Sequence, residues 1–201
     1  LQEVYFQGSL DVLNIGTFRG CSSLRKIELP SGLREIQSYV FDGCQALQRL
    51  NIPNTVETLW ALIAPECGGE LYIDRDVVAT VSKEGSTGEY DESGNISVDR
   101  DPGVFAGAKF TKVTFGSNVK KIATQAFLEN RQLTSISFEG SVELIAYEAF
   151  RGCTSLGGEL TLANVSTIGE KAFNECNFQK LTLQNISTIK EKAFDNCQAL
   201  K

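Results

Sequence analysis

Apolar positions recur along the chain in a fixed order, with a period close to 23 residues. A phenylalanine marks each unit, and the steps from Phe18 to Phe41, from Phe127 to Phe150 and from Phe150 to Phe173 are each 23 residues long. An aliphatic run follows and ends in alternating apolar and polar residues, which is typical of a short strand. Self-similarity at a period of about 20 to 50 residues predicts a stack of repeated units.

The phenylalanine position occurs eight times, which predicts about eight repeats. Ala64 fills this position once, so we expect a local shortfall of packing there and expect Trp60, the only tryptophan, to cover it. Identical positions of neighbouring repeats stack into columns, because one coil cannot bury its apolar side alone. The other seven members of this predicted structural column are Phe18, Phe41, Phe105, Phe127, Phe150, Phe173 and Phe194.

Every cysteine occupies a single repeat position, three residues after the phenylalanine position. Ala108 and Asn130 fill the same position in two other repeats, and a set of metal ligands would not tolerate them. We therefore expect buried free thiols with a structural role, and stacked disulfides or a metal or reactive site are the alternatives. This second column contains Cys21, Cys44, Cys67, Cys153, Cys176 and Cys197.

Polar residues alternate with the apolar ones in each predicted strand, so they face outward on the predicted concave sheet, the surface that solenoids use for binding. Tyr5 and Tyr72 are the best anchors, because interface hot spots favour Tyr, Trp and Arg. A merely solvated sheet face is the alternative interpretation. The candidate binding surface consists of Tyr5, Lys26, Glu28, Arg49, Asn51, Glu70, Tyr72, Lys112, Thr114, Ser135, Ser137, Thr161, Lys180 and Thr182.

Residues 75–103 interrupt the repeat, because the step from position 64 to Phe105 is 41 residues without a second copy of the pattern. Residues 77–81 and 96–98 predict two strands around a Gly-, Ser- and Asp-rich turn, and hence an inserted hairpin that competes with the concave sheet as the functional site. Oxygen ligands near Asp91 suggest calcium as a weaker alternative, since the glycine and terminal Glu of a calcium loop are missing from their places.

The order A-F-x-x-C-x-x-L-x-x-I-x-L-P, as in Phe18 to Pro30 and Phe41 to Pro53, resembles the BspA-like leucine-rich repeats. The resemblance covers nearly the whole chain except the insertion. It implies one domain over residues 1–201: an α/β, right-handed solenoid with a short strand per coil forming a concave parallel sheet. It also implies a cell-surface or secreted protein of bacterial type that takes part in adhesion.

The first nine residues, LQEVYFQGS, look like the scar of a protease tag. Their spacing argues otherwise, because Leu1, Val4 and Phe6 match the positions of later repeats such as the one that contains Phe138. We interpret them as a native repeat. Since the chain begins and stops within a repeat, and terminal repeats are normally atypical caps, we expect it to be part of a longer array.

Composition narrows the function classes. A net charge of −6 argues against nucleic acid as a partner, and no apolar run approaches the roughly 20 residues of a membrane helix, so we expect no direct membrane insertion by this segment. The absence of histidine removes the usual general base and metal ligand, and we expect no cofactor and no catalytic or metal site.

These observations predict a non-enzymatic binding or adhesion module, extracellular or at the cell surface, which engages a protein or glycan through the concave sheet, the inserted hairpin or both. A structural spacer that presents another domain is the alternative. A carbohydrate-active enzyme is a weaker alternative, because no two carboxylates stand out by their spacing and solenoid columns offer no deep pocket.

Overall fold

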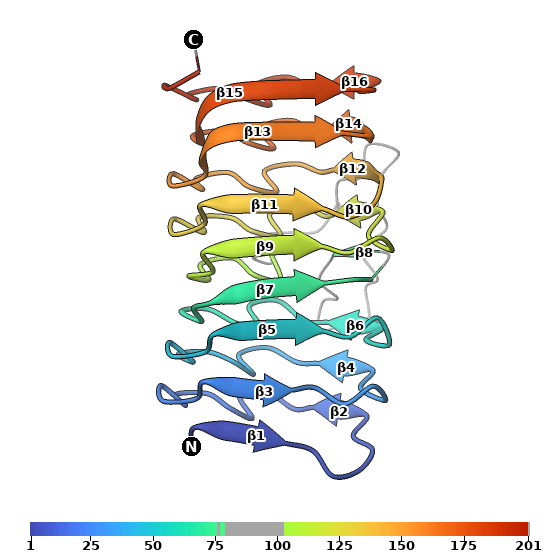
Figure 1. Ribbon diagram of the computed structural model, residues 1–201, viewed down its shortest axis with the longest axis vertical. Coiled ribbons are helices and arrows are strands. Elements are labelled where there is room, and N and C mark those ends of the chain that lie inside the picture. The colour runs from blue at the N-terminus through green and yellow to red at the C-terminus, as the bar shows by residue number, and fades with distance from the viewer. Residues whose placement is uncertain (76, 79–102, 201) are drawn as a thin grey trace.

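The computed structural model describes residues 1–75, 77–78 and 103–200. They form a parallel β-solenoid of about seven turns, with the two chain ends at opposite ends of the stack (Figure 1). One face, here called the odd-strand face, is made by β1 (Glu3–Tyr5), β3 (Lys26–Glu28), β5 (Arg49–Ile52), β7 (Glu70–Ile73), β9 (Lys112–Phe115), β11 (Ser135–Phe138), β13 (Gly157–Ala163) and β15 (Asn177–Gln184).

The second face carries shorter strands, most of them two residues long. They are β2 (Val12–Leu13), β4 (Glu35–Ile36), β6 (Thr58–Leu59), β8 (Val77–Val78), β10 (Lys121–Ile122), β12 (Val142–Ile145), β14 (Val165–Ile168) and β16 (Thr188–Ile189). Strands β2, β4 and β6 form one sheet, and β8, β10, β12, β14 and β16 form another. On the odd-strand face, β5, β7, β9 and β11 pair in one four-stranded sheet, flanked by the pairs β1–β3 and β13–β15.

Pairing follows the repeat, since equivalent positions lie opposite one another. Glu70 faces Arg49 on β5 and Lys112 on β9, and Leu71 faces Leu50 in the same way. Because side chains alternate along a strand, this register sends one set of residues into the core and presents the other to solvent. The burial pattern of β5 shows the result, with Leu50 and Ile52 buried and Arg49 and Asn51 exposed.

The expected helical component of an α/β solenoid is not confirmed. Across residues 1–75, 77–78 and 103–200 the segments between strands are turns rather than helices. Two left-handed residues flank the phenylalanine position in every repeat except that of Phe105, where only Gly107 has a positive φ; Gln125 (φ 54°) and Glu129 (φ 55°) flank Phe127 in this way. A right-handed helix cannot continue through residues of positive φ, so these turns replace the helix that the wider leucine-rich class suggested.

The phenylalanine column forms the centre of the core. Phe150 stacks between Phe127 and Phe173 at centroid distances of 5.2 and 5.1 Å, and all three rings are fully buried. Phe194 continues the stack at 5.5 Å from Phe173 and is half-buried. Each ring therefore adds aromatic stacking to the area it buries.

Ala64 divides this column into two parts. Phe18 and Phe41 stack at 5.9 Å on one side, and the continuous stack begins with Phe105 on the other. Ala64 is itself fully buried, and the backbone ladder runs through it, with the Phe41 N–H donating to the Ile63 carbonyl at 2.8 Å. The interruption therefore affects side-chain stacking and leaves the turns of the solenoid in register.

Trp60 is half-buried, and its indole Nε1 donates a hydrogen bond of 2.8 Å to the Glu35 carboxylate. This contact satisfies the polar atom of the side chain across one coil. Coverage of Ala64 by Trp60 stays a prediction.

The six cysteines are free, and all except the half-buried Cys21 are buried. Four of their thiols form hydrogen bonds to the neighbouring coil. The Sγ atom of Cys153 donates to the carbonyl of Phe127, one coil earlier, at 3.3 Å, and Cys44 does the same to Phe18 at 3.3 Å. Asn130 takes over this role in its repeat, where Nδ2 donates to the Phe105 carbonyl at 2.6 Å. Five of the eight members of this column thus donate to the phenylalanine carbonyl of the previous coil. Cys67 instead donates to the Gly68 carbonyl at 3.7 Å, and Ala108 has no side-chain donor.

Burial holds these thiols in their protonated form. It raises the pKa of Cys44 and of Cys153 from 9.0 to about 12, and it raises the pKa of Cys67, Cys176 and Cys197 as well. A thiol that stays protonated is a poor nucleophile and a poor metal ligand.

The predicted insertion begins inside the solenoid. β8 pairs in parallel with β10, so residues 77–78 belong to the second face. The rest of the expected hairpin and the weaker calcium site lie outside the described residues. Gly103 marks the return of the chain to the stack, because a Cβ atom at this position would lie 1.7 Å from the carbonyl oxygen of Gln125.

Candidate binding surface

All fourteen candidate residues lie on the odd-numbered strands. Tyr72, Thr114 and Thr182 are half-buried, and the other eleven are exposed. The structure brings them together as two adjoining columns of side chains, because the strands pair in register. The columns nevertheless differ in chemistry from one end of the stack to the other.

Aromatic and charged side chains associate at the N-terminal end. The ammonium of Lys26 lies 5.3 Å from the centre of the Tyr5 ring and forms an ion pair of 2.8 Å with Glu28. The Tyr5 hydroxyl donates to Glu3 at 2.9 Å. The hydrogen bond to Glu28 raises the pKa of Lys26, so the lysine remains a cation at any physiological pH.

A second cation–aromatic pair lies on the next two strands of this face, β5 and β7. The Arg49 guanidinium lies 5.8 Å from the Tyr72 ring centre, and its Nε donates to the Asn51 side-chain oxygen at 2.8 Å. The Tyr72 hydroxyl in turn donates to Glu139 at 3.1 Å. Burial, followed by this hydrogen bond, raises the pKa of Tyr72, so the phenol is protonated and able to donate at neutral pH.

These side chains line a shallow groove of about 340 Å³. Arg49, Asn51 and Tyr72 form its strand side, and the turn after β5 closes it. Its complete lining is Glu28, Leu29, Arg49, Asn51, Ile52, Pro53, Asn54, Tyr72 and Asp74. The volume is at the lower end of the range typical of small-molecule sites.

Asp74 is a rigid part of this groove. Its two carboxylate oxygens accept hydrogen bonds from the backbone N–H of Asn118 at 2.7 Å and from the Asn118 side-chain amide at 3.0 Å. Glycine at position 116 makes the arrangement possible, because a Cβ atom there would lie 2.3 Å from the Asp74 carboxylate. Asp74 is therefore held as an acceptor whose orientation is fixed before a ligand arrives.

Hydroxyl groups dominate the C-terminal end of the odd-strand face. Ser137 donates to the Thr114 hydroxyl at 3.2 Å, and Thr161 lies opposite Thr182 in the register of β13 and β15. The other candidates of this end are Lys112, Ser135 and Lys180. Lys180 forms an ion pair of 3.1 Å with Glu159, an exposed contact of small energetic value.

Sequence reasoning missed Asp74, Glu139, Asn54 and Asn118. Asp74 occupies the repeat position that holds proline in Pro30 and Pro53, and Glu139 occupies it again in a later repeat. This departure from the repeat was a usable signal, because a carboxylate in place of a structural proline serves something other than the turn.

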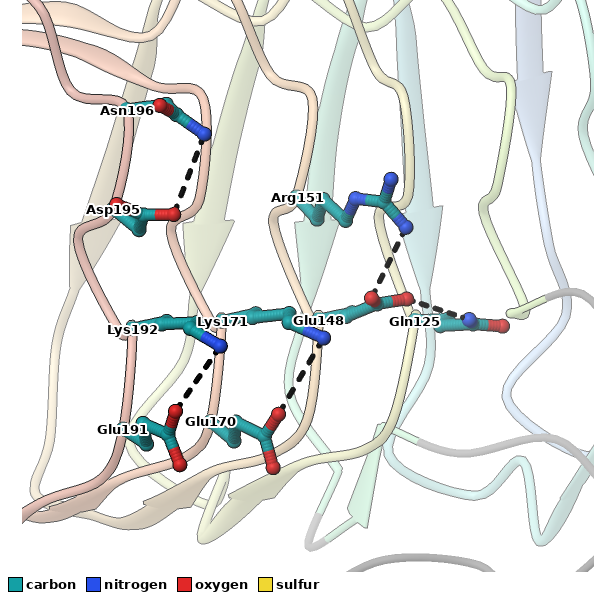
Figure 2. A network of polar contacts seen from close by, with 9 residues as sticks. All are labelled: Gln125, Glu148, Arg151, Glu170, Lys171, Glu191, Lys192, Asp195 and Asn196. Atoms are coloured by element: carbon teal, nitrogen blue, oxygen red, sulfur yellow. Dashed lines mark hydrogen bonds and ion pairs between the residues drawn. The ribbon is translucent and has the colours of Figure 1, made fainter.

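A separate polar network lies on the turns (Figure 2). Gln125, Glu148, Lys171 and Lys192 occupy equivalent left-handed positions, with φ between 51° and 55°. Glu148 is 3 % exposed and accepts hydrogen bonds from Gln125 at 2.9 Å and from Arg151 at 3.0 Å. Lys171 pairs with Glu170 and Lys192 with Glu191. These groups satisfy one another, so the network stabilises the turns and leaves few free polar atoms for a ligand.

Among the residues that the structure describes, no group of three or more His, Cys, Asp or Glu side chains is placed to hold a metal ion. No helix in the same part of the chain is long and apolar enough to cross a membrane.

The decisive comparison is with protein families. The model of the BspA type leucine rich repeat region matches residues 1–61 and 101–201 in six copies, which is more than half of the chain. The chain belongs to the BspA-type leucine-rich repeat family. The match of this BspA-type chain starts at its first residue, and β1 pairs in register with β3, so the first nine residues are part of the repeat.

Two solved structures are similar to this BspA-type chain along its whole length. A leucine rich cell surface protein from Faecalibacterium prausnitzii A2-165 shares 19 % identity with a TM-score of 0.47. A leucine-rich repeat protein from Bacteroides ovatus ATCC 8483 shares 17 % identity with a TM-score of 0.35. The chain spans 60 % and 65 % of their respective lengths. No curated protein matches it.

Proposed function

We propose that this chain is a non-enzymatic binding module of a bacterial surface or secreted protein, and that it engages a protein or glycan through the odd-strand face. The arrangement of Arg49 and Tyr72 carries the proposal. Both side chains stand on a sheet whose backbone groups are already paired, and their mutual contact and their bonds to Asn51 and Glu139 fix them in place. Preorganised side chains lose little entropy when a ligand binds, which favours recognition.

Binding fits the groove better than acid–base catalysis. The two carboxylates that line it are both engaged, Glu28 by Lys26 and Asp74 by Asn118. A glycoside hydrolase needs one carboxyl group that gives up a proton to the leaving oxygen and a second that acts as base or nucleophile. Carboxylates held by a cation and by two amide donors are stabilised as acceptors instead. Membership of the BspA-type family supports the proposed surface location.

The test is a binding screen of the whole chain against immobilised host matrix proteins and glycans. A triple variant, Tyr5→Ala with Arg49→Ala and Tyr72→Ala, should lose binding at least tenfold. The matched control changes three exposed or half-buried groups on the turns, Glu170→Ala, Lys171→Ala and Lys192→Ala, and should bind as the parent does. Parent binding that survives the triple change would contradict the assignment of this face. Absence of binding by the parent would favour a structural spacer.

A further inference from the structure

Arg49 and Lys112 are the strand cations of the described odd-strand face that form no ion pair, and of these two Arg49 lines the groove. Ion pairs of the described residues on this face join Lys26 to Glu28 and Lys180 to Glu159, and none of them includes Arg49. Glu70 lies opposite Arg49 in the register of β5 and β7. The guanidinium nevertheless lies over the Tyr72 ring and its Nε bonds to Asn51. Arg49 is thus a cation whose charge no carboxylate of the described chain neutralises by direct contact.

The geometry of Arg49 leaves its outer edge open. Nε donates a hydrogen bond of 2.8 Å to Asn51, and one face of the guanidinium lies over the Tyr72 ring. The terminal Nη atoms donate to no partner within the described ranges. Two parallel N–H donors on a planar fork match the two oxygens of a carboxylate. Since Tyr72 is fixed by Glu139, the fork is held in position before a ligand arrives.

The remaining lining of the groove is rich in groups that bond hydroxyls. Asn51, Asn54, Glu28 and Asp74 supply amide and carboxylate atoms around Arg49, and the volume of about 340 Å³ admits a ligand of one or two sugar rings. An extended peptide fits less well, because main-chain recognition needs an unpaired strand edge. β7 is already paired on both sides, with β5 and β9.

We propose that this groove binds an acidic sugar, a pyranose ring that carries a carboxylate, at the end or along the chain of a glycan. Its carboxylate lies against the Arg49 fork, and its hydroxyls bond to Asn51, Asn54 and Asp74. This assignment rests on the proposed binding function of the odd-strand face and names the ligand class for one part of it.

Titration calorimetry of the whole chain tests the assignment with glucuronate, glucose and an N-acetylated, amidated glutamate as probes. Glucuronate should bind at least tenfold more tightly than glucose, which has the same ring without the charge, and more tightly than the glutamate probe, which has the charge without the ring. Raising the salt concentration should weaken glucuronate binding, because the contact is ionic and exposed.

Three variants complete the test. Arg49→Met should weaken glucuronate binding at least tenfold, and Arg49→Lys should recover only part of it, because an ammonium lacks the fork. Lys112→Met removes a cation of the same face outside the groove lining and should leave binding unchanged. All three changes lie at exposed positions and should leave the fold intact. A thermal melt of each protein checks this before binding is measured.

Equal binding of glucose and glucuronate, or unchanged binding by Arg49→Met, would overturn the acidic-sugar assignment. Tighter binding of the glutamate probe would assign the groove to an acidic side chain of a protein and would overturn it as well. If none of the probes binds but the triple variant still loses its immobilised partner, only this inference fails. If the parent binds neither probes nor partners, the proposed function fails with it.

Discussion

The two ends of the odd-strand face differ in surface and in core. From β1 to β7 the face presents tyrosines, cations and the groove around Arg49, and the phenylalanine column beneath is interrupted at Ala64. From β9 to β15 the face presents mainly hydroxyl groups, and the column beneath runs without a break from Phe105 to Phe194. The half with the more varied surface therefore has the less continuous core, so the proposed binding surface and the uninterrupted phenylalanine stack lie in different coils of one array.

Truncation of the column should show this difference most strongly. Phe150→Ala removes a ring stacked on both sides and should lower the free energy of unfolding by about 3 to 5 kcal/mol. Phe41→Ala removes a ring that stacks only on Phe18 and should cost less, by roughly 0.5 to 1.5 kcal/mol for the missing aromatic contact. Denaturant melts measure both values, and equal losses would contradict the comparison.

Thiol chemistry should be nearly the same in both halves. With a pKa of about 12 in place of 9.0, Cys44 and Cys153 should react with iodoacetamide at pH 8 roughly a thousandfold more slowly than in the unfolded chain. The same shift stabilises the fold fully below pH 9.0, and that contribution is lost as the pH rises towards 12, because the unfolded chain releases its protons first. Rapid labelling of Cys44 alone would show that the interruption loosens the N-terminal half.

The donor column allows a finer test in the C-terminal half. Asn130→Ala removes one of the two hydrogen bonds of the Phe105 carbonyl, which still accepts the Ala108 N–H, and should destabilise the protein by about 0.5 to 1.5 kcal/mol. Asn130→Cys restores a thiol donor, as in the neighbouring coils, and also removes the buried Asn130 oxygen that has no partner. The cysteine variant should therefore melt at or above the temperature of the parent. A cysteine variant as unstable as the alanine variant would show that the column depends on volume rather than on the bond.

Aromatic truncation probes the surface half of the comparison. Tyr72→Ala frees the Arg49 guanidinium and should weaken ligand binding about tenfold, which corresponds to about 1.4 kcal/mol. Thr182→Ala, at the equivalent position of the hydroxyl-rich end, should change binding by less than about twofold, since surface positions away from the groove contribute little. Binding assays of both variants separate a groove ligand from one that spans the whole face.

The smallest effect concerns an exposed ion pair. Glu28→Ala breaks the contact with Lys26 and should change the free energy of unfolding by less than about 0.5 kcal/mol. A larger loss in denaturant melts would mean that the N-terminal surface also supports the fold.

Periodicity made the strands, their register and both columns predictable, because a coil that buries one set of residues must stack equivalent positions on each other. The turns were less accessible. Glycine at positions 20, 43, 107 and 152 recurs two residues after the phenylalanine position and was a signal for positive φ, hence for turns in place of helices. The groove was only half predictable. Arg49 and Tyr72 follow from strand alternation, whereas the bonds of Tyr72 to Glu139 and of Asp74 to Asn118 join residues 67 and 44 positions apart and depend on side-chain geometry.

The donor column has a consequence for the history of the gene. Most coils repeat one contact, a side chain of the column that donates to the phenylalanine carbonyl of the coil before it, beside the backbone N–H that the same carbonyl accepts from its own coil. The donors are Cys44, Asn130, Cys153, Cys176 and Cys197. Unequal recombination that adds or removes one whole unit among these coils therefore joins matching partners at the new junction. An array of such coils can change its length, and with it the sequence of side chains that it displays, without a new kind of contact at the junction.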